Sequence, residues 1–467
     1  MIPIWKMITR GALCCIILVI ASGFTSISRG QQPNHVYYPV KSGDTLAKIA
    51  ERFLISIDDL ALANPEIGTT GLKEGSLLLI PGMAGEGIVT DYSVAFWETL
   101  KSIQIRYQIP ETTFHLLNKL TSPDELYPGK NITIIQNDLT LPLAGPVRIA
   151  QQQSLLELAA DLSVNPWLLS EVNRRRGLYD ASPNLPIYYQ ASKEDQEEYS
   201  ISPSIQSIEF NKYPLTQGKT TIITIQTDQP YQLTGYLAGH ELRFFETREN
   251  NYVALQGIYA MQLPGIAQLF LKGATTNGQS FEIEQMVQVN RGGYWHEVIK
   301  GVPPETIDPE NMRPEDELIA SITKTATKNR FWDNRFICPG YDPEWITSWF
   351  GTRRTYNDDQ HVYFHTGIDY GGGVGLPITS PAPGVVVFTS DLTVRGKVTF
   401  IDHGWGVYSG FFHQSEIDVN VGDHVLAGQK IGLIGGTGRV TGAHLHWEVW
   451  VNGVQVDPLE WLDQEYP

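Results

Sequence analysis

The feature that most constrains this chain of 467 residues is a unit that occurs three times before residue 200. Each copy opens on a Thr or Ser and reaches an Asn nineteen positions later, in the pairs Thr45 and Asn64, Thr99 and Asn118, and Ser154 and Asn173. Apolar residues fall at matching offsets within the copies: Leu46, Ile49, Phe53, Ile55 and Leu60; Leu100, Ile103, Tyr107, Ile109 and Phe114; Leu155, Leu158, Leu162, Val164 and Leu169. Such a fixed spacing indicates one small folding unit that is used repeatedly.

The first copy predicts a strand, two helices and a second strand. HVYYPV alternates as a strand does, and SGDT supplies a turn and a helix cap. LAKIAERF has helical spacing, Pro65 ends the second helix, and SLLLIPG is typical of a closing strand.

Residues 36–82, which carry this pattern in full, resemble the LysM module. The copies at 90–136 and 146–190 lack the V-x-x-G-D-T opening and resemble divergent LysM modules. The resemblance implies small α+β modules (βααβ) that bind glycans containing N-acetylglucosamine, such as peptidoglycan. For the second and third copies, glycan binding and a role in packing alone both stay open.

The composition indicates a folded protein of about three domains, at roughly 100–200 residues for each. With 42% hydrophobic and 18% charged residues, bulk disorder is excluded. A net charge of -17 argues against a partner nucleic acid, since phosphate neutralisation needs a basic surface. Only Cys338 lies beyond the first hydrophobic stretch, which excludes a disulfide framework and a cysteine-based zinc site.

Residues 1–30 have the order of an export signal. Lys6 and Arg10 precede an apolar run from Ala12 to Ile20, and small residues follow the run. The run is shorter than the ~20 apolar residues of a spanning helix, although an uncleaved membrane anchor stays open. We therefore expect an exported protein that is extracellular, periplasmic or associated with the cell envelope.

The segment 202–290 predicts a domain of short strands. Runs such as TTIITIQT, YQLTGYLAG and AQLFLKGAT alternate and are separated by turn residues. The pattern is similar to a bacterial Ig-like β-sandwich and contains no catalytic constellation. Residues 291–330 are rich in Pro and acidic residues and predict a linker, in which DELIASITKTATKN forms a short helix.

The last domain, 331–463, contains most of the candidate catalytic and metal-ligating residues. Seven of the eleven histidines lie in the final 107 residues. His365 and Asp369 are four apart in FHTGIDYGGG. His444 and His446 are two apart in GAHLHWEVWV, where a strand places both on one face. Two imidazoles, a carboxylate and one position left to water form the ligand set of a catalytic zinc site. A lone His-x-His in a strand, however, is common without a metal.

From Ser348 to Pro458 the sequence strongly resembles the lysostaphin/LytM family of zinc metallopeptidases. The resemblance rests on several motifs in the family's order, including SWFGTRR, FHTGIDY, YSGFFHQSEI, VGDHVLAGQKIGLIGGTG and GAHLHWEV. It implies a mainly antiparallel β domain (the duplicated hybrid motif) whose groove carries one Zn²⁺ ion per chain.

The resemblance implies that His365, Asp369 and His446 ligate the zinc. It implies that His413 and His444 are the catalytic histidines beside the metal. Both sets are complete in this sequence.

The resemblance covers other residues less fully. Gln414 stands where the family usually has Leu, and Arg353 matches a recurrent arginine for which substrate and structural roles stay open. We expect His361 to line the cleft, His403 to occupy a turn between strands, and His424 to lie in a surface turn without a role.

We therefore expect a zinc metalloendopeptidase that hydrolyses peptide bonds in peptidoglycan and is targeted to the glycan by LysM. A non-catalytic activator of other wall hydrolases is the alternative, because degenerate family members have lost ligands or catalytic histidines. All five side chains are present here, which favours the enzyme. A peptidase for protein substrates is poorly supported beside a glycan-binding module, and no carboxylate pair supports a glycosidase.

Overall fold

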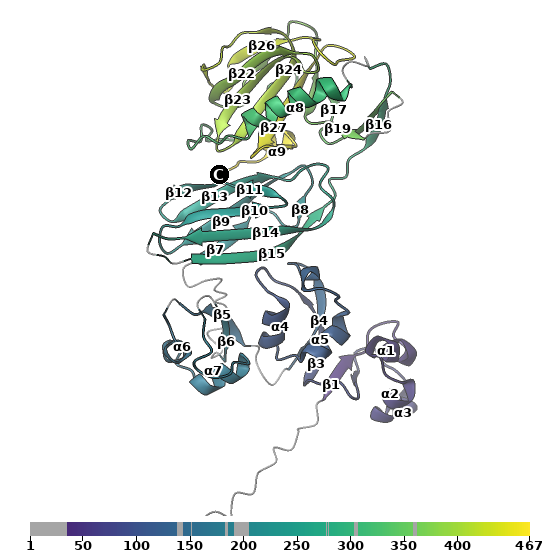
Figure 1. Ribbon diagram of the computed structural model, residues 1–467. Helices are drawn as coiled ribbons and strands as arrows, with labels where there is room; N and C mark the ends of the chain where they lie inside the picture. Colours follow the sequence, from purple (N-terminus) through teal and green to yellow (C-terminus); the bar gives the residue numbers. More distant parts are fainter. Residues whose placement is uncertain are drawn as a thin grey trace, which may run out of the picture. The chain divides into compact units, whose positions relative to one another are not determined.

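The computed structural model describes residues 35–137, 143–150, 152–182, 185–190, 205–276, 278, 280–302, 307–357 and 362–467 (Figure 1). The chain divides into two compact units, the first comprising Met1–Thr90, Pro110–Leu117 and Ile134–Thr140, and the second the remainder. The predicted export signal at residues 1–30 lies outside the described residues. Within the described ranges, no helix is both long and apolar enough to cross a membrane.

The three repeats share the predicted order of elements. The first contains β1 (Val36–Pro39), α1 (Leu46–Phe53), α2 (Ile57–Ala63), α3 (Ile67–Thr70) and β2 (Leu77–Leu79), and β1 pairs antiparallel with β2. The second contains β3 (Gly87–Ser93), α4 (Leu100–Arg106), α5 (Glu111–Asn118), the 3-10 helix η1 (Pro123–Glu125) and β4 (Asn131–Gln136). The third contains β5 (Ala144–Arg148), α6 (Leu155–Asp161), α7 (Pro166–Val172) and β6 (Pro186–Tyr189), and β5 pairs antiparallel with β6.

The Thr or Ser that opens each repeat caps the first helix of that repeat. The side-chain oxygens of Thr45, Thr99 and Ser154 each accept a hydrogen bond from the backbone N–H three residues later, at 3.1–3.2 Å. These bonds satisfy N–H groups that have no partner within the helix.

The Asn that closes the repeated spacing fastens the second helix to the closing strand. Asn64, Asn118 and Asn173 each exchange two hydrogen bonds with the backbone of the residue fifteen positions later, at 2.6–2.8 Å. A buried amide needs such partners for both its oxygen and its nitrogen. The third repeat therefore retains the same internal connection although its opening sequence has diverged.

Two sheets follow the repeats. One has the order β12-β13-β9-β7, with β7 (Ile205–Phe210), β9 (Thr220–Thr227), β12 (Phe244–Arg248) and β13 (Asn251–Gly257). The other has the order β11-β10-β14-β15-β8, with β8 (Leu215–Thr216), β10 (Gln232–Leu237), β11 (His240–Leu242), β14 (Gly265–Ala274) and β15 (Ser280–Asn290). Both contribute to one buried apolar cluster, to which β9 supplies Ile223 and β14 supplies Leu269. The assignment of this region as Ig-like stays a prediction.

The C-terminal domain is built on a large, mainly antiparallel sheet with the order β17-β20-β27-β24-β23-β22-β25, to which β21, β26 and β28 are attached. Its elements are β17 (Ile346–Ser348), β20 (Ile368–Gly371), β21 (Pro377–Thr379), β22 (Gly384–Leu392), β23 (Gly396–Gly404), β24 (Val407–Ile417), β25 (His424–Val425), β26 (Lys430–Ile434), β27 (His444–Val451), β28 (Val454–Val456) and the helix α9 (Leu459–Asp463). A smaller sheet of order β16-β18-β19 contains β16 (His296–Ile299), β18 (Arg353–Tyr356) and β19 (Tyr363–Phe364).

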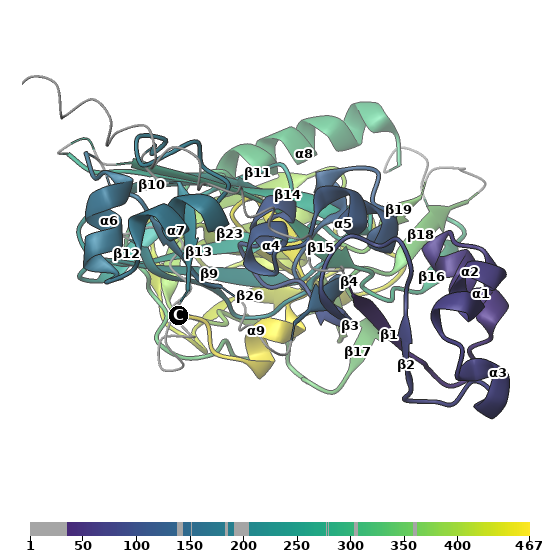
Figure 2. The same cartoon turned by 90° about the horizontal axis from the view of Figure 1, so that it is seen from below.

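The segment predicted as a linker contains the long helix α8 (Pro309–Thr323), which Figure 2 shows as the longest of the described helices. Ile319 of α8 is fully buried in a cluster with Val398 and Phe400 of β23. The carboxylate of Glu315 accepts hydrogen bonds from the backbone N–H groups of Val394 and Arg395, at 2.8 and 3.2 Å. This part of the segment is therefore packed into the C-terminal domain, because it buries apolar surface there.

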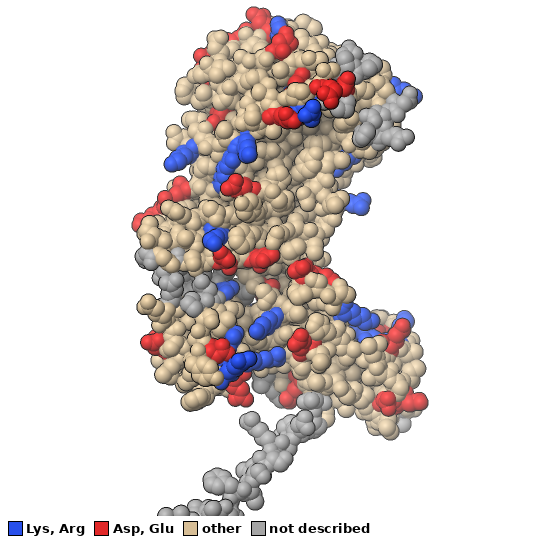
Figure 3. Space-filling view, in the orientation of Figure 1, with Lys and Arg blue, Asp and Glu red and all other residues tan. Residues whose placement is uncertain are grey.

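The surface drawn in Figure 3 carries acidic and basic side chains that are interspersed, with uncharged surface between them.

The remaining histidines differ in their environments. His403, which the sequence places in a turn, lies in β23 and is fully buried, so that interpretation is wrong. Its ring nitrogens lie 2.8 Å from the Pro383 carbonyl oxygen and 3.0 Å from the Ser409 hydroxyl. His424 is exposed in β25, and His361 lies outside the described residues.

His403 gives a testable pH dependence. Burial lowers the pKa of His403 to about 4, whereas an unfolded His titrates near ~6.5. Between these values the unfolded chain binds more protons, so stability falls as the pH falls. At pH 5 the loss relative to pH 8 amounts to about 2 kcal/mol from this residue.

We expect His403→Asn to reduce this loss. Its amide can still donate to the Pro383 carbonyl, but it does not titrate. Denaturant unfolding at pH 8 and pH 5 should be compared for both proteins in the presence of a chelator, which removes pH effects of metal binding. Equal losses of stability in the two proteins would contradict the expectation.

Candidate active site

Three potential ligand atoms converge at one end of β20. His365 Nε2 lies 3.0 Å from Asp369 Oδ1 and 3.0 Å from His446 Nδ1, and His446 Nδ1 lies 2.8 Å from Asp369 Oδ1. The three side chains form a group that could hold a metal ion, and all three residues are buried. Ligands at about 2.0–2.1 Å from a tetrahedral zinc ion are about 3.3 Å apart. The observed spacing therefore fits zinc after a small outward movement.

The sheet register brings these residues together. Asp369 of β20 lies directly opposite His446 of β27, and Gly371 lies opposite His444. Opposed residues in an antiparallel pair share one face of the sheet. His365 reaches the same point from the segment that leads into β20.

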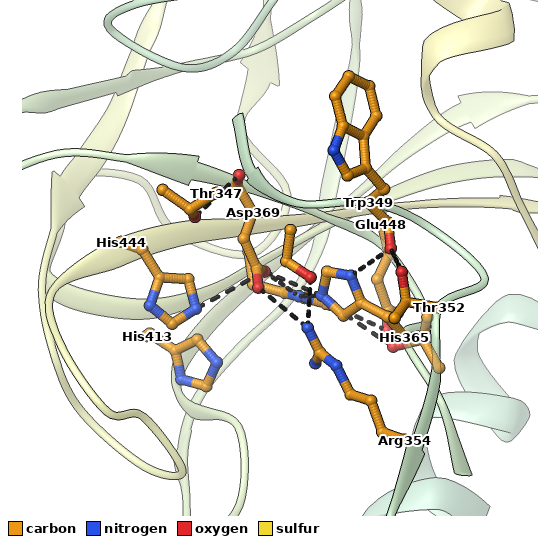
Figure 4. A network of polar contacts seen from close by, with 12 residues as sticks. Thr347, Trp349, Thr352, Arg354, His365, Asp369, His413, His444 and Glu448 are labelled. Atoms are coloured by element: carbon orange, nitrogen blue, oxygen red, sulfur yellow. Dashed lines mark hydrogen bonds and ion pairs between the residues drawn. The ribbon is translucent and has the colours of Figure 1, made fainter. Parts of the chain in front are cut away.

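Hydrogen bonds on the far side of each imidazole determine which nitrogen is available (Figure 4). His365 Nδ1 donates to the Trp349 carbonyl oxygen at 2.9 Å, which leaves the lone pair on Nε2. His446 Nε2 donates to Glu448 Oε1 at 3.3 Å, which leaves the lone pair on Nδ1. Partners of this kind fix the tautomer of metal-binding histidines and orient the ring.

The charges of the cluster support a cation-binding role. Burial lowers the pKa of His365 to about 4, so this ring is neutral at pH 7. Burial alone would raise the pKa of Asp369, but His365 and His446 beside it hold that pKa well below its usual range. Asp369 is therefore a carboxylate, and Arg354 Nη2 lies 3.7 Å from its Oδ2 atom.

Two further histidines lie beside the cluster. The rings of His413 and His444 have centroids 5.0 Å apart, and His444 Nε2 lies 3.6 Å from Asp369 Oδ1. His413 Nδ1 donates to the Thr437 carbonyl oxygen and His444 Nδ1 to that of Gly442, each at 2.8 Å. In both rings the lone pair is therefore left on Nε2.

His413 is held in an unusual environment. Its φ is +61°, in the left-handed region that few residues other than glycine adopt, and its backbone N–H donates to the Arg395 carbonyl oxygen at 3.1 Å. Burial, followed by the neighbouring His444 and His446, holds the pKa of His413 well below its usual value. The ring is therefore neutral at pH 7 and can accept a proton.

The arginine that faces the cluster is Arg354. Arg353 donates to the Ala260 carbonyl oxygen at 2.5 Å and lies 4.9 Å above the Tyr294 ring, which are structural contacts. Arg354 instead donates to the Ser348 hydroxyl at 2.5 Å and approaches Asp369. Neighbouring residues in a strand point to opposite faces, so only one of the two adjacent arginines can face the site. The sequence alone does not indicate whether that residue is Arg353 or Arg354.

Glu448 was also missed by the sequence analysis. It is fully buried, and it accepts hydrogen bonds from His446 and from Trp450 Nε1, the latter at 2.7 Å. Its position two residues after His446 on β27, on the same face, is the signal that could have identified it.

A cavity of about 620 Å³ opens onto these residues. Its lining includes His413 and His444, and also Met312 and Asp316 of α8. The site is therefore accessible, although the ligand atoms themselves are buried.

Comparison with known proteins places two kinds of domain in this chain. The model of Peptidase family M23 matches residues 363–458, and the LysM domain model matches residues 38–81 and 92–134.

Individual relatives match the chain in part. The peptidoglycan DD-endopeptidase ShyA of Vibrio cholerae is 39% identical over 120 residues, 26% of this chain and 28% of that protein. The DD-carboxypeptidase/endopeptidase Mpg of Neisseria meningitidis is 40% identical over 95 residues, 20% of this chain and 22% of that protein. A solved structure described as a zinc-containing peptidase from Vibrio cholerae aligns with 81% of this chain and 100% of its own, at 15% identity and a TM-score of 0.28.

The chain thus spans under a third of the length of these two sequence relatives. Its M23 match includes the three residues of this cluster and the two histidines beside it. The chain contains a peptidase domain of family M23, of the LytM type, preceded by two LysM domains.

Proposed function

We propose that this protein is a zinc metalloendopeptidase that hydrolyses peptide bonds in peptidoglycan, in the cell envelope or outside the cell. The observation that carries the proposal is the convergence of His365 Nε2, Asp369 Oδ1 and His446 Nδ1 within 3.0 Å of one another. The family match and the names of the two sequence relatives support the same reaction.

In this proposal His365, Asp369 and His446 hold one zinc ion. Zinc bound there would polarise a carbonyl oxygen and lower the pKa of a water molecule. Trp349 and Glu448 hold the two rings in the required tautomers, and Arg354 lies close enough to steady the Asp369 carboxylate. The sequence and structure supply two imidazoles and one carboxylate, as in other catalytic zinc sites.

His413 and His444 are the proposed catalytic histidines. In each ring, Nδ1 donates a hydrogen bond to a backbone carbonyl, which leaves the lone pair on Nε2. Either ring can orient the attacking water and accept its proton at Nε2, and the Nε2–H so formed can then donate a hydrogen bond to the developing oxyanion or give the proton to the leaving amine. The two rings are close enough to act on one scissile bond.

The LysM domains are the proposed means of attachment to the glycan, with boundaries at 36–82 and 90–136. The third repeat, 146–190, is proposed as a further LysM-like module because it retains the Ser154 cap and the Asn173 connection. The region 202–290 is proposed to be an Ig-like spacer, and residues 1–30 an export signal.

A non-catalytic activator of other wall hydrolases remains the second candidate. Such a protein needs the groove but not the full set of reactive side chains. Here five buried or half-buried side chains, with their hydrogen-bonding partners, are retained, which favours catalysis.

Digestion of purified peptidoglycan tests the reaction. We expect new amino termini in the fragments, no new reducing sugars, and reversible loss of hydrolysis on addition of a chelator. Mass analysis of the fragments identifies the bond that is cut. New reducing sugars would refute the endopeptidase, and a chain that holds zinc but cuts no peptidoglycan would favour the activator.

Substitutions separate ligands from catalytic residues. His446→Ala leaves two ligands and should lose the metal, whereas His413→Ala should keep it and lower the rate by about 10²–10⁴-fold. Glu448→Gln preserves the shape of the side chain but removes its charge, and should weaken zinc binding by about 10–100-fold. Zinc content and hydrolysis should be measured on all three variants. A metal-free His413→Ala protein would show that this residue is a ligand.

Deleting residues 36–82 tests attachment. We expect weaker binding to insoluble peptidoglycan and unchanged cleavage of a small soluble cross-linked peptide, because the reactive cluster lies in a different domain of the chain. A sedimentation assay with wall material measures the first, and a peptide assay the second. Equal sedimentation with and without the segment would rule out a role for it in attachment.

A further inference from the structure

A tryptophan outside the cluster lies on the same face of the sheet as the proposed ligands. The carbonyl oxygen of Trp345 accepts a hydrogen bond from the Gly371 N–H at 2.8 Å, beside the edge strand β17. The indole lies over Gly371: a Cβ atom added there would come within 2.4 Å of Trp345 Cε2. Only a glycine therefore leaves room for the ring in this position.

The sheet geometry determines which face the indole covers. Gly371 and Asp369 are two residues apart in β20, so the positions of their Cβ atoms point to the same face. Gly371 is also paired with His444, which shares that face. The indole thus lies on the face of the sheet that also carries His444 and the Asp369 carboxylate.

The distance sets which substrate residue the indole meets. Asp369 and Gly371 are two positions apart in β20, which is about 7 Å along the strand. An extended substrate peptide advances about 3.3–3.6 Å for each residue. A peptide whose scissile bond lies at the ligands, and which extends along β20 toward Gly371, therefore meets the indole two residues from that bond.

The exposed face of the indole indicates the chemistry of that contact. Trp345 is 53% exposed although its indole packs on Gly371. Isolated exposed apolar side chains are common and need no explanation. This one differs because a glycine is needed to hold it flat on the ligand face, where it offers a rigid apolar surface.

We propose that Trp345 determines substrate specificity by contacting the aliphatic side chain of the peptide residue two positions from the scissile bond. This inference rests on the proposed endopeptidase function. It assigns a binding contact to Trp345 and no part in the chemical step.

A double comparison of enzyme and substrate tests the contact. Soluble cross-linked peptides are prepared with the parent residue, or glycine, two positions from the cut bond on each side in turn. We expect glycine on one side to lower kcat/KM of the wild-type chain about tenfold, mainly through KM. Trp345→Ala should lower kcat/KM on the parent peptide by a similar factor and should no longer discriminate against glycine at that position.

Two controls accompany this comparison. Trp345→Phe keeps an aromatic surface and should recover most of the discrimination, and Trp295→Ala removes another exposed indole and should leave it unchanged. Zinc content measured on each variant shows whether the metal site is intact.

The outcomes are distinct. A Trp345→Ala chain that still discriminates as the wild type does, or that has lost its zinc, overturns the inference alone. A wild-type chain that cuts none of the peptides overturns the proposed function, and this inference with it.

Discussion

The pairing of β20 with β27 is the interaction on which the candidate site depends. It sets Asp369 opposite His446 and Gly371 opposite His444, so that one register determines both a ligand pair and the neighbour of a proposed catalytic ring. A slip of one residue would turn every side chain of one strand to the opposite face. Such a slip is opposed by the buried residues between them, since Tyr370 and Leu445 are both fully buried on the other face. The apolar core therefore holds the reactive face in register.

Burial of the ligand atoms has an electrostatic consequence. Three ligand atoms lie within 3.0 Å of one another, on three residues that are all buried. Burial would lower the pKa of His446, but its hydrogen bonds to Asp369 and Glu448 raise it instead, so protonation of this ring competes with the metal. A cation bound between the three atoms would remove that conflict, and its binding free energy would add to the stability of the fold. The arrangement is thus better suited to a metal than to a hydrogen-bonded cluster alone.

The sequence predicted those parts of the structure that local spacing determines. The helix caps at Thr45, Thr99 and Ser154 and the Asn nineteen positions later follow from spacing within one small unit, and the His-x-His pattern follows from the period of a strand. Contacts that depend on tertiary packing were not predictable in this way. The choice between two adjacent arginines, the burial of His403 and the packing of α8 each depend on segments far away in the chain. The proline-rich composition indicated a linker, but Pro309 stands at the first position of α8, where proline is compatible with helical structure, and the helix also includes Pro314.

The two sheets before the peptidase domain also contribute to the environment of its site. Val253 and Leu255 of β13 belong to the same buried cluster as Val456 of β28, and Glu460 of α9 accepts a hydrogen bond from the Thr220 backbone N–H at 2.7 Å. These contacts hold β13 and the segment that follows it against the peptidase domain. That segment contains Ala260, whose carbonyl oxygen accepts a hydrogen bond from Arg353. Because adjacent residues in β18 point to opposite faces, anchoring Arg353 on one side directs Arg354 to the other, toward Asp369. A region without reactive groups of its own thereby helps to position the Arg354 guanidinium, which faces the proposed zinc ligand Asp369.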